Sequence, residues 1–210
     1  MKTKAMSWLT MLAAGAAGVT ALMVRGASQA SAPGDFQPIM EAELPIGFPS
    51  PGPVGEIRLK SYPAYRMAET KSEQGGGFWT LFRHIKANDI AMTAPVEMTY
   101  SRDSDGKTLQ TRMAFLYGDP SLGTAEVEGP VQVVDVPAMQ VVSLGLSGPH
   151  TPERISEAAG RLRTWIGENS PQYVAAGDVR VMGYNSPFVP RDRRYFEVQI
   201  PVEEREPAGE

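Results

Sequence analysis

The sequence predicts an α+β fold in which two similar halves, each ordered strand–strand–helix–strand–strand, form a distorted antiparallel barrel with two helices packed outside it. Three observations support this prediction. A Pro-Ala turn occurs twice, at 63–64 and at 137–138. The two expected helix starts, Phe78 and Pro152, are separated by the same sequence offset as the two turns. Segments of alternating apolar and polar residues flank each turn, as half-buried strands do. Such α+β barrels often leave a ligand cavity or cleft.

In the first half, the clearest element is a helix over 78–87. At about 100° per residue, Phe78, Leu81, Phe82 and Ile85 share an arc of about 100° that would face a core. Pro95 has no backbone N–H, so it marks an edge, a bulge or the end of a strand. The expected elements, in order, are strands 54–60 and 65–70, a loop at 72–77, the helix at 78–87, strand 90–99, a polar turn at 101–107 and strand 109–118.

The second half contains a helix that begins at Pro152. Thr151 can cap its first turn, and proline is favoured at the first helical position. Glu153 lies close to the positive end of the helix dipole, which stabilises the helix start. The other expected elements are strands at 131–136, 139–146, 179–185 and 194–200.

The segments outside this repeat predict export. Lys2 and Lys4 precede a largely apolar, uncharged run over 8–24, and Ala30-Ser31-Ala32 fits the small-x-small rule for signal-peptide cleavage. Residues 1–32 are therefore either a cleaved signal peptide or an uncleaved membrane anchor through 8–24. Both place the protein outside the cytoplasm, as a periplasmic, secreted or tethered protein. The remaining divisions are a proline-rich linker at 33–53, a folded domain at 54–202 and an acidic, disordered tail at 203–210.

Composition excludes several function classes. The formal net charge is −4, and no basic stripe with interleaved aromatic residues occurs, which argues against nucleic-acid binding. Cysteine is absent, so thiolate metal sites and cysteine nucleophiles are excluded. Neither a Gly-x-Ser-x-Gly elbow, a His-Glu-x-x-His pair nor a phosphate loop is present.

The first helix and the segment that follows it carry the candidate binding residues. His84 could be an axial ligand of a haem iron, or only a half-exposed histidine beside the helix core. Arg83 and Lys86 lie on the same flank as Trp79, where they could bind the carboxylates of an anionic ligand or be simply solvated. Met92 suits either an adaptable apolar pocket or an ordinary core.

Three segments resemble the SOUL/haem-binding-protein family, namely "YPAYRMAET", "GFWTLFRHIKANDIAMTAPVEMTY" and "MGYNSPFVPRDRRYFEVQI". Their order and separation are specific, and the resemblance covers roughly residues 54–201. It implies a duplicated βαββ-type unit that forms a distorted barrel with two helices. The fold of this family is also similar to the effector-binding domains of some bacterial regulators, which hold small, often cationic, amphiphiles.

The resemblance implies non-covalent binding of haem or a related tetrapyrrole by an apolar patch beside the first helix. Matched to this sequence, that patch consists of Trp79, Phe82, Arg83 and Lys86, with Met92 behind it. The basic side chains would lie near the propionates. Some family members have a histidine before the tyrosine of the first turn, but Ser61 is found at that position here. His84 stands where members commonly have an aromatic residue, so it is a possible substitute ligand.

We therefore expect a non-enzymatic tetrapyrrole-binding protein that buffers or carries its ligand outside the cytoplasm. Three alternatives stay open at this point. The domain could bind a different small amphiphile, with Glu97 facing the pocket. It could be a hydrolase that uses Glu69 and Glu97 as an acid–base pair. It could also be a structural or interaction protein of the cell envelope.

Overall fold

The computed structural model describes residues 36–71, 77–169 and 172–205. The chain divides into two units, Met1–Ala30 and Ser31–Glu210, and every feature below belongs to the second. The predicted signal peptide or anchor at 1–32, most of the loop at 72–77 and the end of the tail, 206–210, lie outside the described residues. Within the described ranges, no helix is long and apolar enough to cross a membrane.

The described residues form ten strands, two α-helices and one short 3-10 helix, so the predicted α+β class is confirmed. The first half contains β1 (Ile57–Tyr62), β2 (Tyr65–Lys71), α1 (Gly77–Ala87), β3 (Val96–Arg102) and β4 (Thr108–Leu116). After the short β5 (Val127–Glu128), the second half contains β6 (Val131–Val136), β7 (Met139–Ser147), α2 (Pro152–Glu168), β8 (Tyr173–Ala175), β9 (Val179–Gly183), η1 (Arg191–Arg193) and β10 (Tyr195–Glu204).

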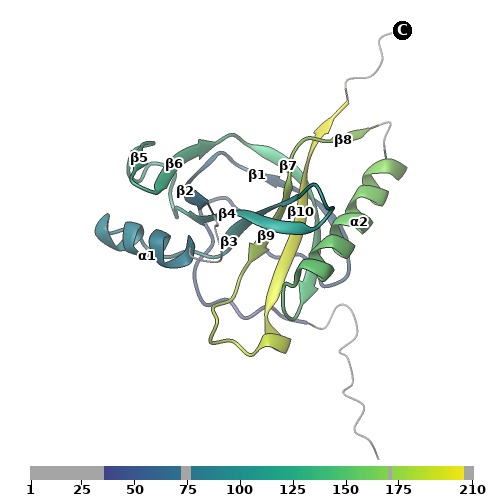
Figure 1. Ribbon diagram of the computed structural model, residues 1–210, viewed down its shortest axis with the longest axis horizontal. Coiled ribbons are helices and arrows are strands. Elements are labelled where there is room, and N and C mark those ends of the chain that lie inside the picture. The colour runs from purple at the N-terminus through teal and green to yellow at the C-terminus, as the bar shows by residue number, and fades with distance from the viewer. Residues whose placement is uncertain (1–35, 72–76, 170–171, 206–210) are drawn as a thin grey trace, which may run out of the picture. The chain divides into compact units, whose positions relative to one another are not determined.

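The strand order reflects the internal repeat. The strands form one sheet in the order β1-β7-β10-β9-β3-β4-β2-β6-β5, with β8 paired to β10, and the strand pairs are antiparallel (Figure 1). In the repeat, β1 corresponds to β6, β2 to β7, β3 to β9 and β4 to β10. Replacing each strand from β1 to β6 in this order by its counterpart gives the same order read backwards, with β3 beside β9 in the middle. The register agrees, because Tyr62 pairs with Met139 and Tyr65 pairs with Val136. Val136 follows Tyr62, and Met139 follows Tyr65, at the offset that separates the two Pro-Ala turns.

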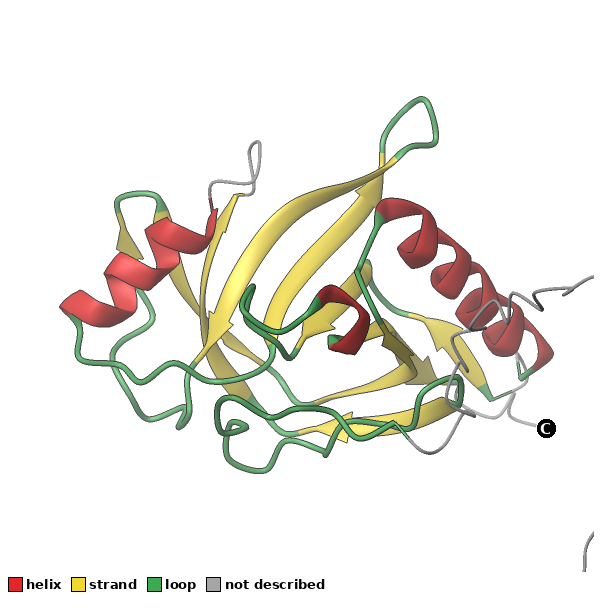
Figure 2. Cartoon of the chain, turned by 90° about the horizontal axis from the view of Figure 1, so that it is seen from below, coloured by secondary structure: helices red, strands yellow, loops and turns green. Residues whose placement is uncertain are grey.

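Closure of the sheet into a barrel is not confirmed. The order begins with β1 and ends with β5, and no pairing joins these two strands in the part of the chain that the structure describes. The strands are nevertheless strongly bent and twisted, as Figure 2 shows. The architecture is therefore a curved antiparallel sheet with two α-helices.

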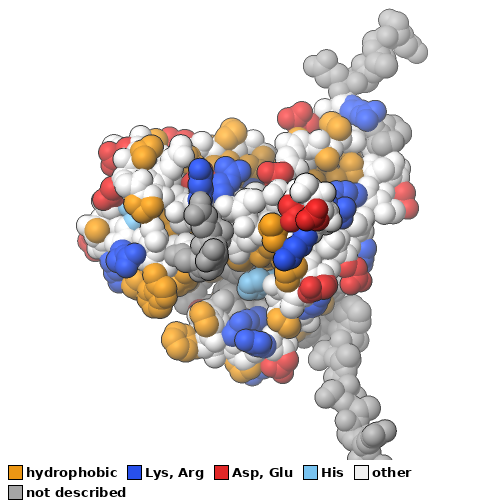
Figure 3. Space-filling view, in the orientation of Figure 1, with side chains coloured by type: hydrophobic (Ala, Val, Ile, Leu, Met, Phe, Trp, Pro, Cys, Tyr) orange, Lys and Arg blue, Asp and Glu red, His pale blue; other side chains and the backbone are white. Residues whose placement is uncertain are grey.

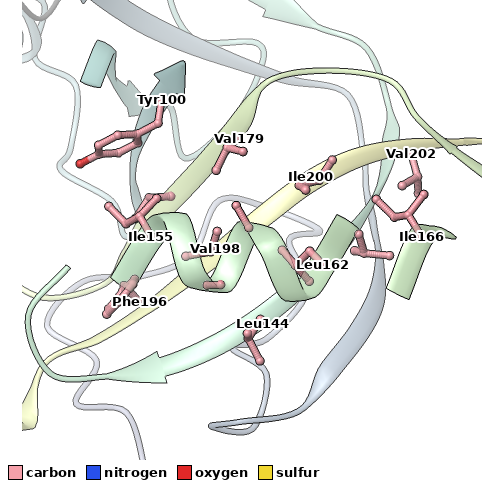
Figure 4. Packing of buried hydrophobic residues seen from close by; sticks show 14 of the residues in the cluster. Tyr100, Leu144, Ile155, Leu162, Ile166, Val179, Phe196, Val198, Ile200 and Val202 are labelled. Atoms are coloured by element: carbon pink, nitrogen blue, oxygen red, sulfur yellow. The ribbon is translucent and has the colours of Figure 1, made fainter. Parts of the chain in front are cut away.

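Both α-helices pack on one face of this sheet. Phe115 beneath α1 and Phe196 beneath α2 are linked by directly opposed partners, since Phe115 pairs with Val96, Val96 with Gly183 and Gly183 with Phe196. Opposed residues point to the same side of a sheet. The buried stripe of α2 packs on β7, β9 and β10 (Figure 4) through Ile155, Ala158, Ala159, Leu162 and Ile166. Thr151 caps this helix as predicted.

The opposite face is covered by residues 36–54, which we call the covering segment. Most of this segment was predicted to be an extended linker, and it contains no helix or strand apart from an isolated bridge at Val54. Its apolar side chains pack on the sheet against a cluster that includes Tyr62, Val141, Met182 and Tyr195. Figure 2 shows the two α-helices at the left and right of the strands, with irregular segments along the lower part of the view.

Two local differences from the predicted elements have simple causes. The strand predicted over 90–99 begins only at Val96, directly after Pro95, so the proline marks a strand end. The short strands β5 and β8 were not predicted because segments of two and three residues carry no readable alternation.

Candidate functional site

Helix α1 lies on the sheet with an apolar side turned inward and an aromatic side turned outward. Leu81 and Ile85 are buried against β2, β4 and β6. Gly77 begins the helix where the backbone passes close to the sheet, since an added Cβ would lie 3.3 Å from side-chain carbons of both Thr70 and Met113. This close contact fixes which side of α1 faces solvent.

Three aromatic rings form the outer surface of α1. Trp79 is 66% exposed, and its ring meets those of Phe78 and Phe82 edge-on at centroid distances of 5.4 Å and 5.8 Å. Phe78 and Phe82 are themselves stacked at 6.1 Å and are partly buried in the core beneath the helix. The core therefore holds two rings firmly while the third is left in water. Figure 3 shows hydrophobic side chains gathered beside basic ones over α1.

Two cations border this aromatic surface. Lys86 places its Nζ 5.7 Å from the centroid of the Phe82 ring, a cation–π contact. Arg83 is exposed and has no hydrogen bond or ion pair with any residue that the structure describes. Trp79 contacts Phe82, Phe82 contacts Lys86, and Arg83 is exposed on the same helix. We call these four residues the outer α1 face.

His84 lies on a different side of the helix from these residues. It is only 8% exposed, rather than half exposed as predicted, and both ring nitrogens have partners. Its Nδ1 lies 2.8 Å from a carboxylate oxygen of Glu128, and its Nε2 lies 2.9 Å from the hydroxyl of Tyr117. An iron ligand needs a free ring nitrogen. Coordination by His84 stays a prediction and would require one of these two bonds to break.

Met92 is partly buried and packs in the cluster beneath α1 with Leu81, Ile85 and Phe115. It therefore contributes to the support of the outer α1 face, in line with its predicted place behind that face. In the ranges that the structure describes, no cluster of three histidine, aspartate or glutamate side chains could hold a metal ion.

A groove of about 680 Å³ lies beside the N-terminal end of α1. Its walls are Gly77 and Thr80 of the helix, the β5–β6 hairpin, the end of β2 and Arg112 in the middle of β4. Its volume falls within the range of small-molecule sites. None of the six predicted site residues is among the described residues that line it, so this groove was not anticipated from the sequence.

The two carboxylates considered for a hydrolase do not form an acid–base pair. Glu69 and Glu97 both lie opposite Ala114, one on each side of β4. Each has its own cation, since Glu69 lies 3.6 Å from Arg112 and Glu97 lies 3.3 Å from the buried Arg180. Two carboxylates that are each neutralised by an arginine lack the contrast in environment that an acid and a base require.

The sheet face beneath the covering segment contains a buried polar centre that the sequence did not reveal. Glu197 is fully buried, and its carboxylate accepts hydrogen bonds from Lys60 Nζ at 2.6 Å, from the backbone N–H of Gly52 at 2.6 Å and from the hydroxyl of Tyr195 at 2.9 Å. Tyr184 and Gln199 donate to its other oxygen. This carboxylate therefore ties the covering segment to the sheet.

Tyrosines on this face are held in the neutral form. Burial, followed by the nearby charge of Glu197, raises the pKa of Tyr62 to about 12. Burial and Glu97 likewise raise the pKa of Tyr65, and burial and Glu197 raise that of Tyr195. The Phe48 ring of the covering segment packs edge-on against Tyr62 at 4.9 Å and Tyr65 at 5.1 Å. This face therefore already encloses one aromatic group.

Comparison with protein-family models matches residues 54–201 to the family described as SOUL heme-binding protein. The matched range covers nearly the whole folded domain and includes α1 and the strands around it. Comparison with curated proteins gives no match.

Among solved structures, 36 chains match. The EcmrR chain in a cryo-EM complex with DNA has a TM-score of 0.56 and 18% identity, with 71% of this chain covered. Only 58% of that chain is covered, so this protein spans little more than half of its length. The EcmrR C-terminal domain has a TM-score of 0.52 and is covered over 98%. A protein described as a hydrolase from Listeria innocua has a TM-score of 0.53 at 11% identity, with 73% and 94% coverage. At these identities the likeness concerns the fold alone.

Proposed function

Since this chain belongs to the SOUL heme-binding protein family, we propose that it is a non-enzymatic binding protein for haem or a related tetrapyrrole. We place it outside the cytoplasm, as an exported or membrane-tethered protein that buffers or carries its ligand. The location follows from the signal-like residues 1–32 of the sequence. The ligand follows from the family and from the chemistry of the outer α1 face.

The observation that carries the proposal is the exposed Trp79 on a rigid aromatic base with Arg83 and Lys86 beside it. A tetrapyrrole offers a broad apolar face and two carboxylates. An aromatic side chain has roughly 200 Å² of surface, and about two thirds of that of Trp79 is exposed. Burying this exposed part under a ligand would contribute about 3 kcal/mol before association costs. Guanidinium and ammonium groups at the border of the rings suit the propionates, since charge-assisted hydrogen bonds are comparatively strong.

The residues present fit binding through the tetrapyrrole face better than binding through an axial bond. Apolar rings and cations are available on the outer α1 face, whereas both nitrogens of His84 are already hydrogen-bonded. Bound haem would supply its iron chemistry itself. The protein's residues would hold the ring, orient the propionates and exclude water from one side of it.

A titration of the full chain with haem and with its metal-free porphyrin tests the proposal. Because binding depends on the ring face and the propionates, we expect both compounds to bind with similar affinity, within about tenfold, or about 1.4 kcal/mol. Failure of both to bind would overturn the proposed ligand class. Binding of haem alone would overturn the face-binding mode in favour of iron coordination.

A second candidate ligand is another small amphiphile, held on the face beneath the covering segment. The observation in favour is that Tyr62 and Tyr65 already enclose the ring of Phe48, beside the Glu97–Arg180 pair. The Phe48→Ala variant would open this place. Stronger binding of an aromatic organic cation by that variant than by the unaltered chain would support the second candidate, and equal weak binding would dismiss it.

A further inference from the structure

The loop between β9 and β10 displays an apolar side chain that nothing in the described residues covers. Phe188 is 93% exposed, whereas its neighbour Val189 is buried at 7% exposure. The loop is held from within, because the guanidinium of Arg194 donates to the backbone carbonyls of Val189 and Pro187, both at 2.8 Å. Prolines on both sides of the Phe188–Val189 pair restrict the backbone further. Phe188 is therefore presented on a firm support.

Basic side chains lie next to this exposed ring. Arg191 and Arg193 are exposed on η1, and neither side chain has a hydrogen bond or ion pair with a described residue. Together with Arg194 they give three positive charges against two negative ones, those of Asp192 and of Glu41, whose carboxylate is bound to Ser186 of the loop. The surface is thus locally basic although the whole chain carries a net charge of −4. Figure 3 shows basic and hydrophobic side chains side by side over this loop, at the lower edge of the view.

The described chain begins beside the same loop. The ring of Phe36 stacks on Tyr195 at 6.1 Å, and the Asn185 side chain donates to the carbonyl of Ile39 at 2.6 Å. The carboxylate of Glu41 accepts from the N–H and the hydroxyl of Ser186. Met40, which is 42% exposed, thereby adds a second apolar side chain next to the loop.

The distance along the sequence connects this surface to the apolar N-terminal run. Only the segment 25–35 lies between Val24 and Phe36, and a fully extended segment of that length spans at most about 40 Å. If the run over 8–24 lies in a bilayer, the end of the domain that carries Phe188 stays within reach of the lipid headgroups.

We propose that the surface formed by Met40, Phe188, Arg191 and Arg193 contacts an anionic phospholipid bilayer. The phenyl ring enters the region between headgroups and acyl chains, and the two guanidinium groups bind lipid phosphates. Such a surface is weak alone, so it acts together with the N-terminal anchor and fixes the orientation of the domain on the membrane. The proposal rests on the tethered form of the proposed function and does not depend on haem.

The absence of cysteine allows a direct test on the full chain. Single cysteines replace either Phe188 or Val127, a comparably exposed apolar residue on β5 (73% exposed), and each carries an environment-sensitive fluorophore. The labelled proteins are mixed with vesicles of phosphatidylcholine, with or without phosphatidylglycerol, and separated by flotation. We expect the label at 188, but not at 127, to shift to shorter wavelength and to be quenched by lipid-borne quenchers. The response should be stronger with phosphatidylglycerol.

The variant Arg191→Gln with Arg193→Gln, labelled at 188, should require a higher fraction of anionic lipid. The expected weakening is about fivefold for each arginine. If the protein floats with the vesicles but the labels at 188 and 127 show equal emission shifts and equal quenching, the proposed contact surface is overturned, whereas the proposed membrane tether is not. Failure of the protein to float would overturn both. Haem titration of the same samples in parallel shows whether tetrapyrrole binding succeeds or fails independently.

Discussion

His84 illustrates how a single residue can point to different chemistry once its surroundings are known. In the sequence it is one of only two histidines and lies in the segment that resembles a haem-binding family. In the structure it joins α1 to Glu128 of the β5 strand and to Tyr117 after β4. A sequence cannot reveal these partners because they are distant along the chain and belong to separate elements. We infer that the residue mainly connects elements around the groove.

The variant His84→Ala tests this role. We expect a loss of unfolding free energy of about 1–3 kcal/mol, because the buried hydroxyl of Tyr117 loses its partner. We also expect the Soret band of any bound haem to stay at its position. Urea unfolding and absorption spectra check the two expectations. A displaced Soret band would instead support axial coordination by His84.

Glu197 is a residue whose importance only the structure reveals. Replacement by alanine should lower the free energy of unfolding by about 3–5 kcal/mol, because Lys60 would remain charged and buried without its partner. The matched control is Glu203→Ala at the exposed end of the same strand, which should change stability by no more than about 0.5 kcal/mol. Similar unfolding midpoints for the two variants would contradict the role assigned to Glu197.

The buried tyrosines predict alkaline instability. Because the pKa of Tyr62 is about 12 in the folded protein and 10 is its ordinary value, the folded state keeps a proton that the unfolded chain loses. The contribution of Tyr62 to the free energy of unfolding is therefore fully present below pH 10, and it is lost as the pH rises from 10 to about 12. Across this range, the free energy of unfolding should fall less steeply with pH in the Tyr62→Phe variant than in the unaltered protein. The expected difference between the two slopes is up to about 1.4 kcal/mol per pH unit. Identical slopes would contradict the assignment.

At the scale of elements, periodicity predicted the helices well and the irregular segments poorly. The stripe of Leu81 and Ile85 identified α1, and Thr151 with Pro152 located the start of α2 to the residue. The covering segment has no period, because its prolines prevent regular structure, so its packing on the sheet could not be read from the sequence. The same limit hid the groove, whose walls come from separate elements.

The outer α1 face provides an element-scale prediction. Arg83→Glu should weaken tetrapyrrole binding by at least tenfold, which is about 1.4 kcal/mol, because a carboxylate would repel the propionates. The exposed Arg163→Glu on α2 is the matched control, with the same charge change on the other helix. Fluorescence or absorption titration compares the two. Equal affinities for both variants would remove the outer α1 face as the binding surface.

At the scale of the whole molecule, the internal repeat is what made the fold predictable. The sequence offset between the two Pro-Ala turns recurs in the pairing of β1 with β7 and of β2 with β6. The pairing of β1 and β2 of the first half with β7 and β6 of the second was not predicted. A repeat indicates which elements exist, but it does not indicate which strands pair. Nor did the repeat determine closure, and the described strands form an open sheet.

The most direct test of the central claim is a haem titration of the full chain followed at the Soret band. The proposal predicts a saturable increase that ends near one equivalent and is strongly weakened in a Trp79→Ala variant whose unfolding midpoint is unchanged. The loss should appear in affinity alone, since Trp79 is mostly exposed and supports little of the core. No spectral change at micromolar protein, or identical titrations for both proteins, would contradict the account.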